Sequence, residues 1–141
     1  KFKDYFVLRL EKGEEIINAL KQAASNNRTT APVAPTTATG KDLVLGYYDA
    51  HRKSYVKKAF AGEYEFTSFS GNIARFKDEI IVHCHVTITD CEFHAFGGHL
   101  FQGIVPATCE IILFPFSKTL KRKKDRVTGL VLLDLSSAVS N

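Results

Sequence analysis

Two histidines separated by one residue, His83 and His85, are the clearest sign of chemistry in the sequence. They lie in residues 80–90 (IIVHCHVTITD), where apolar and polar side chains alternate as in a strand with one buried face. The alternation predicts that Cys84 faces the core and that both imidazoles lie on the polar face, about 6.6 Å apart along the strand. Two imidazoles at this spacing can lean toward one point and bind zinc at about 2.0–2.1 Å. The pair therefore predicts two ligands of a metal site.

His99 is the candidate third ligand. It follows Gly97 and Gly98, whose missing side chains allow a neighbouring backbone or another subunit to approach closely. Three neutral imidazoles and one water would form an open, four-coordinate zinc site. Histidines that only form hydrogen bonds at a polar interface would fit the same spacing, so both interpretations stay open at this point. His51 and His94 fall in predicted turns and are expected to face solvent.

Other patterns of catalytic residues are weak or missing. No G-x-S-x-G nucleophile motif, phosphate-binding P-loop or G-x-G-x-x-G fingerprint occurs in the sequence. Nothing near Cys91 or Cys109 distinguishes either from an ordinary buried thiol. Glu63 and Glu65 share one face of a predicted strand, where they could act as paired acids or simply cover an exposed surface.

The basic residues are concentrated near the end of the chain. The protein has 19 Lys and Arg against 15 Asp and Glu, a formal net charge of +4. Residues 118–126 (KTLKRKKDR) contain six basic residues and one acid. Such a run can bind nucleic acid phosphates, although it more often forms a solvated turn. Residues 121–126 are therefore predicted to form a basic turn and are a candidate DNA contact.

The order of elements predicts an α+β domain with a mainly antiparallel β-sheet and one principal α-helix. The helix is expected to begin after Gly13 and to end at residues 25–27, with apolar residues at three- and four-residue steps. Residues 29–39 (TTAPVAPTTAT) hold two of the four prolines and are predicted to be a loop or an extended edge. Strands are expected at residues 5–10, 43–48, 54–60, 64–69, 80–89, 94–101, 107–116 and 128–135, with breaks at 61–62 and 70–72.

Length and composition predict a single domain over residues 1–141. Hydrophobic residues make up 45% and charged residues 24%, which is typical of a globular protein and excludes a disordered chain. No apolar run approaches the ~20 residues of a membrane-spanning helix, so no membrane partner is expected. Three cysteines without framework spacing favour reduced thiols, and we therefore expect a cytoplasmic protein.

Five segments carry motifs that occur together and in register. They are residues 45–49 (LGYYD), 64–73 (YEFTSFSGNI), 82–86 (VHCHV), 96–100 (FGGHL) and 128–130 (TGL). Together they resemble the PPC domain, which is conserved between plants and prokaryotes and occurs in plant AT-hook nuclear proteins. The resemblance extends from the first predicted strand to about Leu135, nearly the whole chain.

This resemblance implies a compact α+β domain that assembles as a homotrimer. It also implies that His83, His85 and His99 correspond to the family's three histidines, which are candidate zinc ligands in prokaryotic members. The family is often described as DNA-binding, but in plant members the AT-hook binds the minor groove and this domain mediates association. No R-G-R-P hook occurs in this sequence, so that implication does not carry over.

Two segments depart from the family pattern. Residues 29–39 replace a strand and a glycine-containing turn that are usual in the family, at a place expected to contact neighbouring subunits. Phe93 stands where a turn glycine is common, which predicts a different hairpin ahead of His99.

From these features we expect a non-enzymatic, trimeric, metal-binding protein of the cytoplasm with a DNA-binding or regulatory role. The alternative is a small zinc-dependent hydrolase or lyase. In that alternative a three-histidine zinc lowers the pKa of bound water to about 7, and Glu65 is the candidate proton acceptor.

Overall fold

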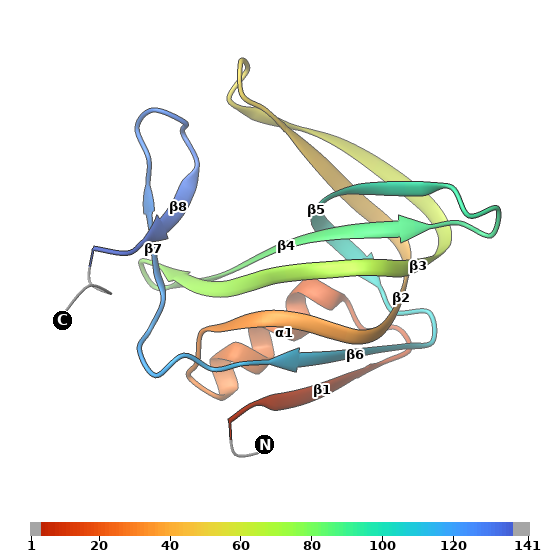
Figure 1. The fold of residues 1–141 in the computed structure, drawn as a ribbon, viewed down its shortest axis with the longest axis horizontal. Helices are drawn as coiled ribbons and strands as arrows, with labels where there is room; N and C mark the ends of the chain where they lie inside the picture. The colour runs from red at the N-terminus through yellow and green to blue at the C-terminus, as the bar shows by residue number, and fades with distance from the viewer. Residues whose placement is uncertain (1–3, 137–141) are drawn as a thin grey trace.

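The computed structural model describes residues 4–136, which form one α-helix and eight β-strands (Figure 1). The elements are, in chain order, β1 (Phe6–Glu11), α1 (Ile16–Asn26), β2 (Ala31–Asp49), β3 (Ser54–Phe76), β4 (Glu79–Thr89), β5 (Ala95–Ile104), β6 (Thr108–Leu113), β7 (Lys121–Lys124) and β8 (Val131–Asp134). Within this range every pair of neighbouring strands is antiparallel except β3 and β7. The prediction of a mainly antiparallel sheet with one principal helix is confirmed.

Helix α1 occupies the segment that its apolar periodicity predicts. The Glu15 carboxylate caps its first turn by accepting hydrogen bonds from the backbone N–H groups of Ile17 (3.2 Å) and Asn18 (2.7 Å). The same carboxylate accepts a hydrogen bond from the Gly103 N–H (3.2 Å), which ties the start of the helix to β5. The apolar face of α1 contacts β3, β4 and β5. No helix within residues 4–136 is both long and apolar enough to cross a membrane.

The sheet closes on itself through its longest strands. Its order is β1-β6-β2-β5-β4-β3-β7-β8, and β2 also pairs with β3. Because β4 lies between β3 and β5, these pairings make β2, β3, β4 and β5 a closed ring of hydrogen-bonded neighbours. The end of β2 and the start of β3 form a hairpin that extends away from α1 (Figure 1). Fully buried side chains of the core include Ile16, Leu20, Leu43, Ile73, Ile88, Leu100, Val105, Ile111 and Leu113.

The prediction of a loop or edge for residues 29–39 is wrong, because most of this segment is the first half of β2. Val33 pairs with Gly71 of β3 on one side and with Leu113 of β6 on the other, so the strand is internal. The missing N–H of Pro35 is tolerated because pairing with β3 is interrupted between Val33 and Thr39. Pairing with β6 also shifts register just after Pro35. The β-branched residues of the segment suit a strand once both neighbours are present.

Strand β3 continues through both predicted breaks. At the first of these, Gly62 has φ +89°, and its N–H donates to the Asp42 carboxylate across an irregularity in the pairing of β2 with β3. This is a bulge within a continuous ladder rather than a turn. At the second, Gly71 lies so close to β4 that no side chain would fit there. Glycine at these positions permits a distortion or a close approach without ending the strand.

The predicted basic turn at residues 121–126 is also wrong in its structure. Lys121–Lys124 form β7, which pairs with β8, and the turn follows at residues 125–130. The Asp125 carboxylate organises that turn by accepting hydrogen bonds from the N–H and the hydroxyl of Thr128, both at 2.7 Å. The basic side chains therefore alternate between the two faces of a hairpin.

Replacing Gly71 with alanine is expected to destabilise the protein. A Cβ at Gly71 would lie 2.2 Å from the His83 carbonyl oxygen and 2.8 Å from the Cys84 Cα, both backbone atoms of β4. Relief of this overlap requires β3 and β4 to separate, and overpacking of this kind costs about 1–3 kcal/mol of unfolding free energy. Urea denaturation measures the loss.

Gly97→Ala is the matched control, because the nearest atom to its added Cβ is the Val86 carbonyl oxygen at 3.2 Å. We expect a smaller loss for Gly97→Ala than for Gly71→Ala. An unfolding free energy for Gly71→Ala equal to that of the native chain would contradict the close approach of β3 and β4.

Candidate metal centre

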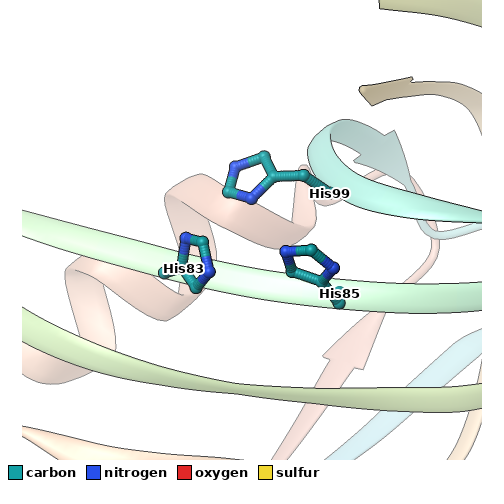
Figure 2. A group of neighbouring side chains, drawn as sticks. All are labelled: His83, His85 and His99. Carbon is teal, nitrogen blue, oxygen red and sulfur yellow. The ribbon is translucent and has the colours of Figure 1, made fainter. Parts of the chain in front are cut away.

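Three histidines from two adjacent strands turn their rings toward one another (Figure 2). His83 and His85 project from the same face of β4, and His99 of β5 pairs directly with His85 in the sheet register. The ring centroids are 5.1 Å apart for His83 and His85, 4.8 Å for His83 and His99, and 5.5 Å for His85 and His99. One nitrogen from each ring lies within 4.8 Å of the others.

The alternation along β4 fixes which side chains reach this cluster. Cys84 is fully buried between the two histidines and faces the core, as the sequence predicts. Gly98, the residue before His99, lies so close to β2 that an added Cβ would be 2.8 Å from the Gly46 carbonyl oxygen. This approach holds β5 against β2 and sets the position from which His99 projects.

Burial keeps two of the imidazoles neutral. It is the main reason that the pKa of His83 falls to about 4, with smaller contributions from the charges of Arg122 and His85. Burial likewise lowers the pKa of His99 to about 4, and the neighbouring histidines, Arg122 and Lys57 act in the same direction. Neutral imidazole is the form that binds a metal ion, so both side chains are in that form at neutral pH.

His99 is the most enclosed member of the cluster. Its ring lies 4.6 Å from the ring of Phe101 and 5.3 Å from that of Tyr55, measured between centroids. Its Nδ1 is buried and has no hydrogen-bond partner within residues 4–136. A buried polar atom without a partner is costly, and a bound cation would satisfy a ring nitrogen. The donor set therefore fits a metal ion that prefers imidazole, such as zinc.

Arg122 lies beside the histidines, although its charged segment was predicted to be a turn facing solvent. From β7 it donates one hydrogen bond to the Asn72 side-chain oxygen (2.8 Å) and one to the Val131 carbonyl oxygen (2.7 Å). Asn72 is itself the register partner of His83, which places the guanidinium next to the cluster. Alternation along a strand of four basic residues predicts that one or two of them point inward. No local sequence feature predicts which residues they would contact.

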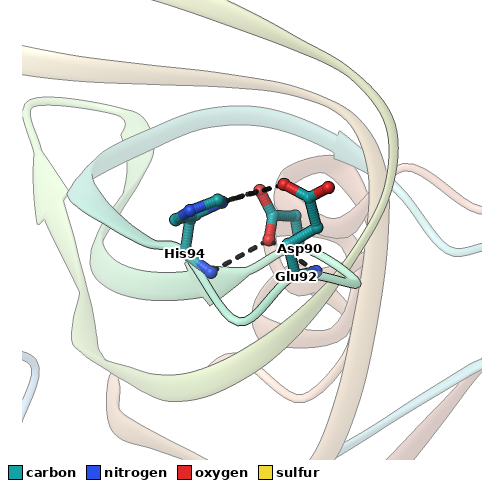
Figure 3. A network of polar contacts seen from close by, with 3 residues as sticks. All are labelled: Asp90, Glu92 and His94. Atoms are coloured by element: carbon teal, nitrogen blue, oxygen red, sulfur yellow. Dashed lines mark hydrogen bonds and ion pairs between the residues drawn. The ribbon is translucent and has the colours of Figure 1, made fainter.

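The remaining histidines lie where the sequence predicts. His51 is exposed in the turn after β2, and His94 is exposed in the turn between β4 and β5. His94 Nδ1 lies 3.3 Å from the Asp90 carboxylate, which also accepts hydrogen bonds from the N–H groups of Glu92 and His94 (Figure 3). Phe93 in this turn has φ +65°, a left-handed conformation that favours glycine. These contacts organise the turn and do not reach the cluster.

The predicted acidic candidates are separated from the three histidines, and the buried thiols are unreactive. Glu63 and Glu65 line a different cavity of about 400 Å³, and no histidine of the cluster lines it. Glu65 pairs with Thr89, four residues along β4 from His85, so its assignment as a proton acceptor beside the metal is wrong. Burial raises the pKa of the Cys84 and Cys109 thiols to about 12, which leaves both unreactive at neutral pH.

These features define a small, mostly β protein with one short helix and a three-histidine cluster that could hold a metal ion. The chain matches the model of the Plants and Prokaryotes Conserved (PCC) domain over residues 1–117, and it belongs to this family. The resemblance found in the sequence motifs is thereby confirmed. No curated protein matches the chain significantly.

Three solved structures illustrate the relationship. A plant- and prokaryote-conserved (PPC) protein of Pyrococcus horikoshii is 28% identical, with a TM-score of 0.85 over 92% of this chain and 90% of that chain. A metal-containing protein of Archaeoglobus fulgidus is 29% identical, with a TM-score of 0.83 over 94% of this chain and 96% of that chain. A protein of Ralstonia eutropha JMP134 that is proposed to bind DNA is 25% identical, with a TM-score of 0.82 over 94% of this chain and 96% of that chain.

The metal-free protein is expected to lose stability as the pH falls from 6.5 toward 4. In the folded chain His83 and His99 remain neutral to about pH 4, but in the unfolded chain they bind protons near pH 6.5. The unfolded state therefore binds more protons in this window, and linkage lowers the free energy of unfolding as the pH falls. The stabilisation by the two neutral histidines is complete above about pH 6.5 and is lost progressively as the pH falls toward 4. Urea denaturation of chelator-treated protein over this pH range measures the slope.

Replacing His83 and His99 together with glutamine should flatten this pH dependence. His51→Gln is the control, because it removes an exposed imidazole from a turn. A slope that persists unchanged in the double variant would show that these two histidines do not cause it.

Proposed function

We propose that this protein is a metal-binding member of the PCC family in which His83, His85 and His99 hold a zinc ion. The observation that carries the proposal is the convergence of three imidazoles whose ligand atoms lie within 4.8 Å of one another. The lowered pKa values of His83 and His99 and the unpartnered Nδ1 of His99 support it. The name of the metal-containing relative from Archaeoglobus fulgidus points the same way. A zinc ion bound by three imidazoles would keep a position open for water or another ligand.

We further propose that residues 1–141 form a single domain that assembles as a homotrimer in the cytoplasm. Tyr47 and Val56, which pair in the β2–β3 hairpin, are 74% and 51% exposed, and large apolar side chains at such a place favour contact with another copy. The free thiols of Cys84, Cys91 and Cys109 support a reducing compartment. Sedimentation that finds only monomer at micromolar concentration would contradict the trimer.

A DNA-binding or regulatory role is supported by the exposed cations of β7 and the turn after it. Lys121, Lys123 and Lys124 are exposed, and Arg126 is exposed in the turn that follows. Lys123 forms an ion pair with Asp134 (3.1 Å), which leaves the other three cations to attract phosphate. The relative from Ralstonia eutropha is itself proposed to bind DNA. The role proposed here is non-enzymatic, with affinity supplied by phosphate contacts.

A zinc-dependent hydrolase or lyase is the second candidate, because a cavity of about 600 Å³ adjoins His83 and His99. Such an enzyme needs space for a substrate beside the metal, and this cavity supplies it. Its proton acceptor would have to be a group other than Glu65. Turnover that depends on the bound metal distinguishes this candidate from the non-enzymatic one.

Elemental analysis of untagged protein, purified without chelator or added metal, is expected to find about one zinc per chain. A His83→Ala, His85→Ala double variant should lose the metal because only one imidazole would remain. His51→Ala with His94→Ala is the matched control, since it removes two exposed histidines from turns. Absence of zinc from the native chain, or its retention in the His83 and His85 variant, would refute the proposed site.

Gel retardation with duplex DNA tests the role of these exposed cations. Binding is expected to weaken with salt, with a log–log slope of about −0.9 for each phosphate contacted. Replacing Lys121 and Lys124 with glutamine should reduce the magnitude of that slope by about 2. Lys12→Gln with Lys21→Gln removes the same charge from another exposed surface as a control. No retardation at physiological salt, or a slope unaffected by the β7 changes, would argue against DNA binding through this strand.

A further inference from the structure

A cavity beside His83 and His99 is bounded on one side by the β7–β8 hairpin. It has a volume of about 600 Å³ and is lined by His83 and His99 on one side and by residues of the hairpin on the other. Contacts that hold the hairpin in place include the hydrogen bond from the Tyr48 hydroxyl to the Thr128 carbonyl oxygen (2.5 Å) and that from the Arg75 N–H to the Leu120 carbonyl oxygen (2.9 Å). A volume of this size is typical of a site for a small organic molecule.

The charged side chains that line the cavity are all of one sign. Lys53 and Arg122 are in the lining, and no aspartate or glutamate is. Asp125, in the nearby turn, interacts electrostatically with Lys53, so that cation is partly compensated. Arg122 has no such compensation, because no carboxylate within residues 4–136 lies within ion-pair distance of it.

Arg122 is a desolvated cation with unused hydrogen-bond donors. It is half-buried, and burial lowers its pKa, which reflects the cost of removing the guanidinium from water. Its two hydrogen bonds go to neutral oxygens of Asn72 and Val131, and its buried Nε has no partner in the described part of the chain. Each terminal nitrogen carries a second hydrogen, so the group can still bind an anion. Buried guanidinium groups normally meet a carboxylate or phosphate, and the missing acid points to a ligand.

A metal ion bound by the three histidines would strengthen the preference of the cavity for an anion, so the inference rests in part on the proposed zinc site. Three neutral imidazoles leave the charge of the ion uncompensated and one coordination position open. Arg122 lies close enough to lower the pKa of both His83 and His99 through its charge. An acidic head group could therefore meet the metal and the guanidinium at the same end of the cavity.

The rest of the lining is largely apolar. The lining includes Ile81 and Val82 of β4 and Leu130, Leu132 and Leu133 of the hairpin. These residues cannot satisfy a polar ligand, but they would bury a hydrocarbon or aromatic body. The cavity thus combines one cationic end with one apolar wall.

We propose that this cavity binds a small organic anion, with its carboxylate or phosphate head at Arg122 and the three-histidine metal, and its apolar body against Ile81 and the β7–β8 hairpin. Arg122 acts here as a binding residue.

The test is isothermal titration of the zinc-loaded full chain with 3-phenylpropionate, phenyl phosphate and the uncharged 3-phenylpropanamide. Saturable binding of one or both anions and no binding of the amide are expected, and the two anions show which acidic head the site prefers. Arg122→Gln should weaken anion binding about tenfold or more, because it removes a charged hydrogen bond. Lys21→Gln, which removes an exposed charge from α1, should change it less than about twofold. Arg122→Lys keeps the charge and should recover part of the affinity if the glutamine variant is poorly folded.

Zinc content is measured on every variant so that failure of the metal site can be distinguished from failure of the anion site. If the purified chain carries no zinc but still binds the anion, and Arg122→Gln abolishes that binding, the anion site is supported and the metal site is refuted. Equal binding by the native chain and Arg122→Gln would overturn the anion site. The absence of saturable binding at millimolar anion would also overturn the anion site. That result is expected if a carboxylate of a neighbouring copy fills the cavity instead.

Discussion

The backbone register between β4 and β5 determines whether this protein has a site at all. His85 lies opposite His99 in that ladder, and His83 follows on the same face two residues away. A shift of one residue would turn His99 to the opposite face and replace it with Gly98 or Leu100. The register is held by the burial of Cys84 and Leu100, and by the close approach of Gly98 to the β2 backbone. Core packing on one face therefore positions the imidazoles on the other.

The cost of desolvation links the histidines to the hairpin that covers them. The ring of strands encloses His99 and holds two imidazoles neutral, which favours metal binding. The β7–β8 hairpin then adds Arg122, a guanidinium whose hydrogen bonds all go to neutral groups. Neither feature stabilises the isolated chain, since unpaired buried cations and orphaned ring nitrogens both raise its free energy. A ligand could compensate both features, because His99 and Arg122 line the same cavity.

Strand β7 shows how one short basic segment can contribute to two surfaces. Because side chains alternate along a strand, Arg122 points toward the histidines while Lys121 and Lys123 point outward. The inward residue meets a cavity suited to a small anion, and the outward residues meet solvent, where the phosphates of DNA could reach them. A ligand in the cavity and an acidic macromolecule outside would thus bind to opposite faces of the same hairpin.

Patterns within short segments of the sequence are enough to predict several features of this protein. The three-four periodicity of the helix, the alternation that places His83 and His85 on one face, and the motifs that identify the family are properties of short segments. Other features depend on partners distant in the chain. Residues 31–39 became an internal strand because β3 and β6 flank them, although their prolines predict an edge. Glu65 proved remote from His85, and Arg122 adjacent to His83, because strand pairing across long sequence separations decides such distances, and no local propensity encodes them.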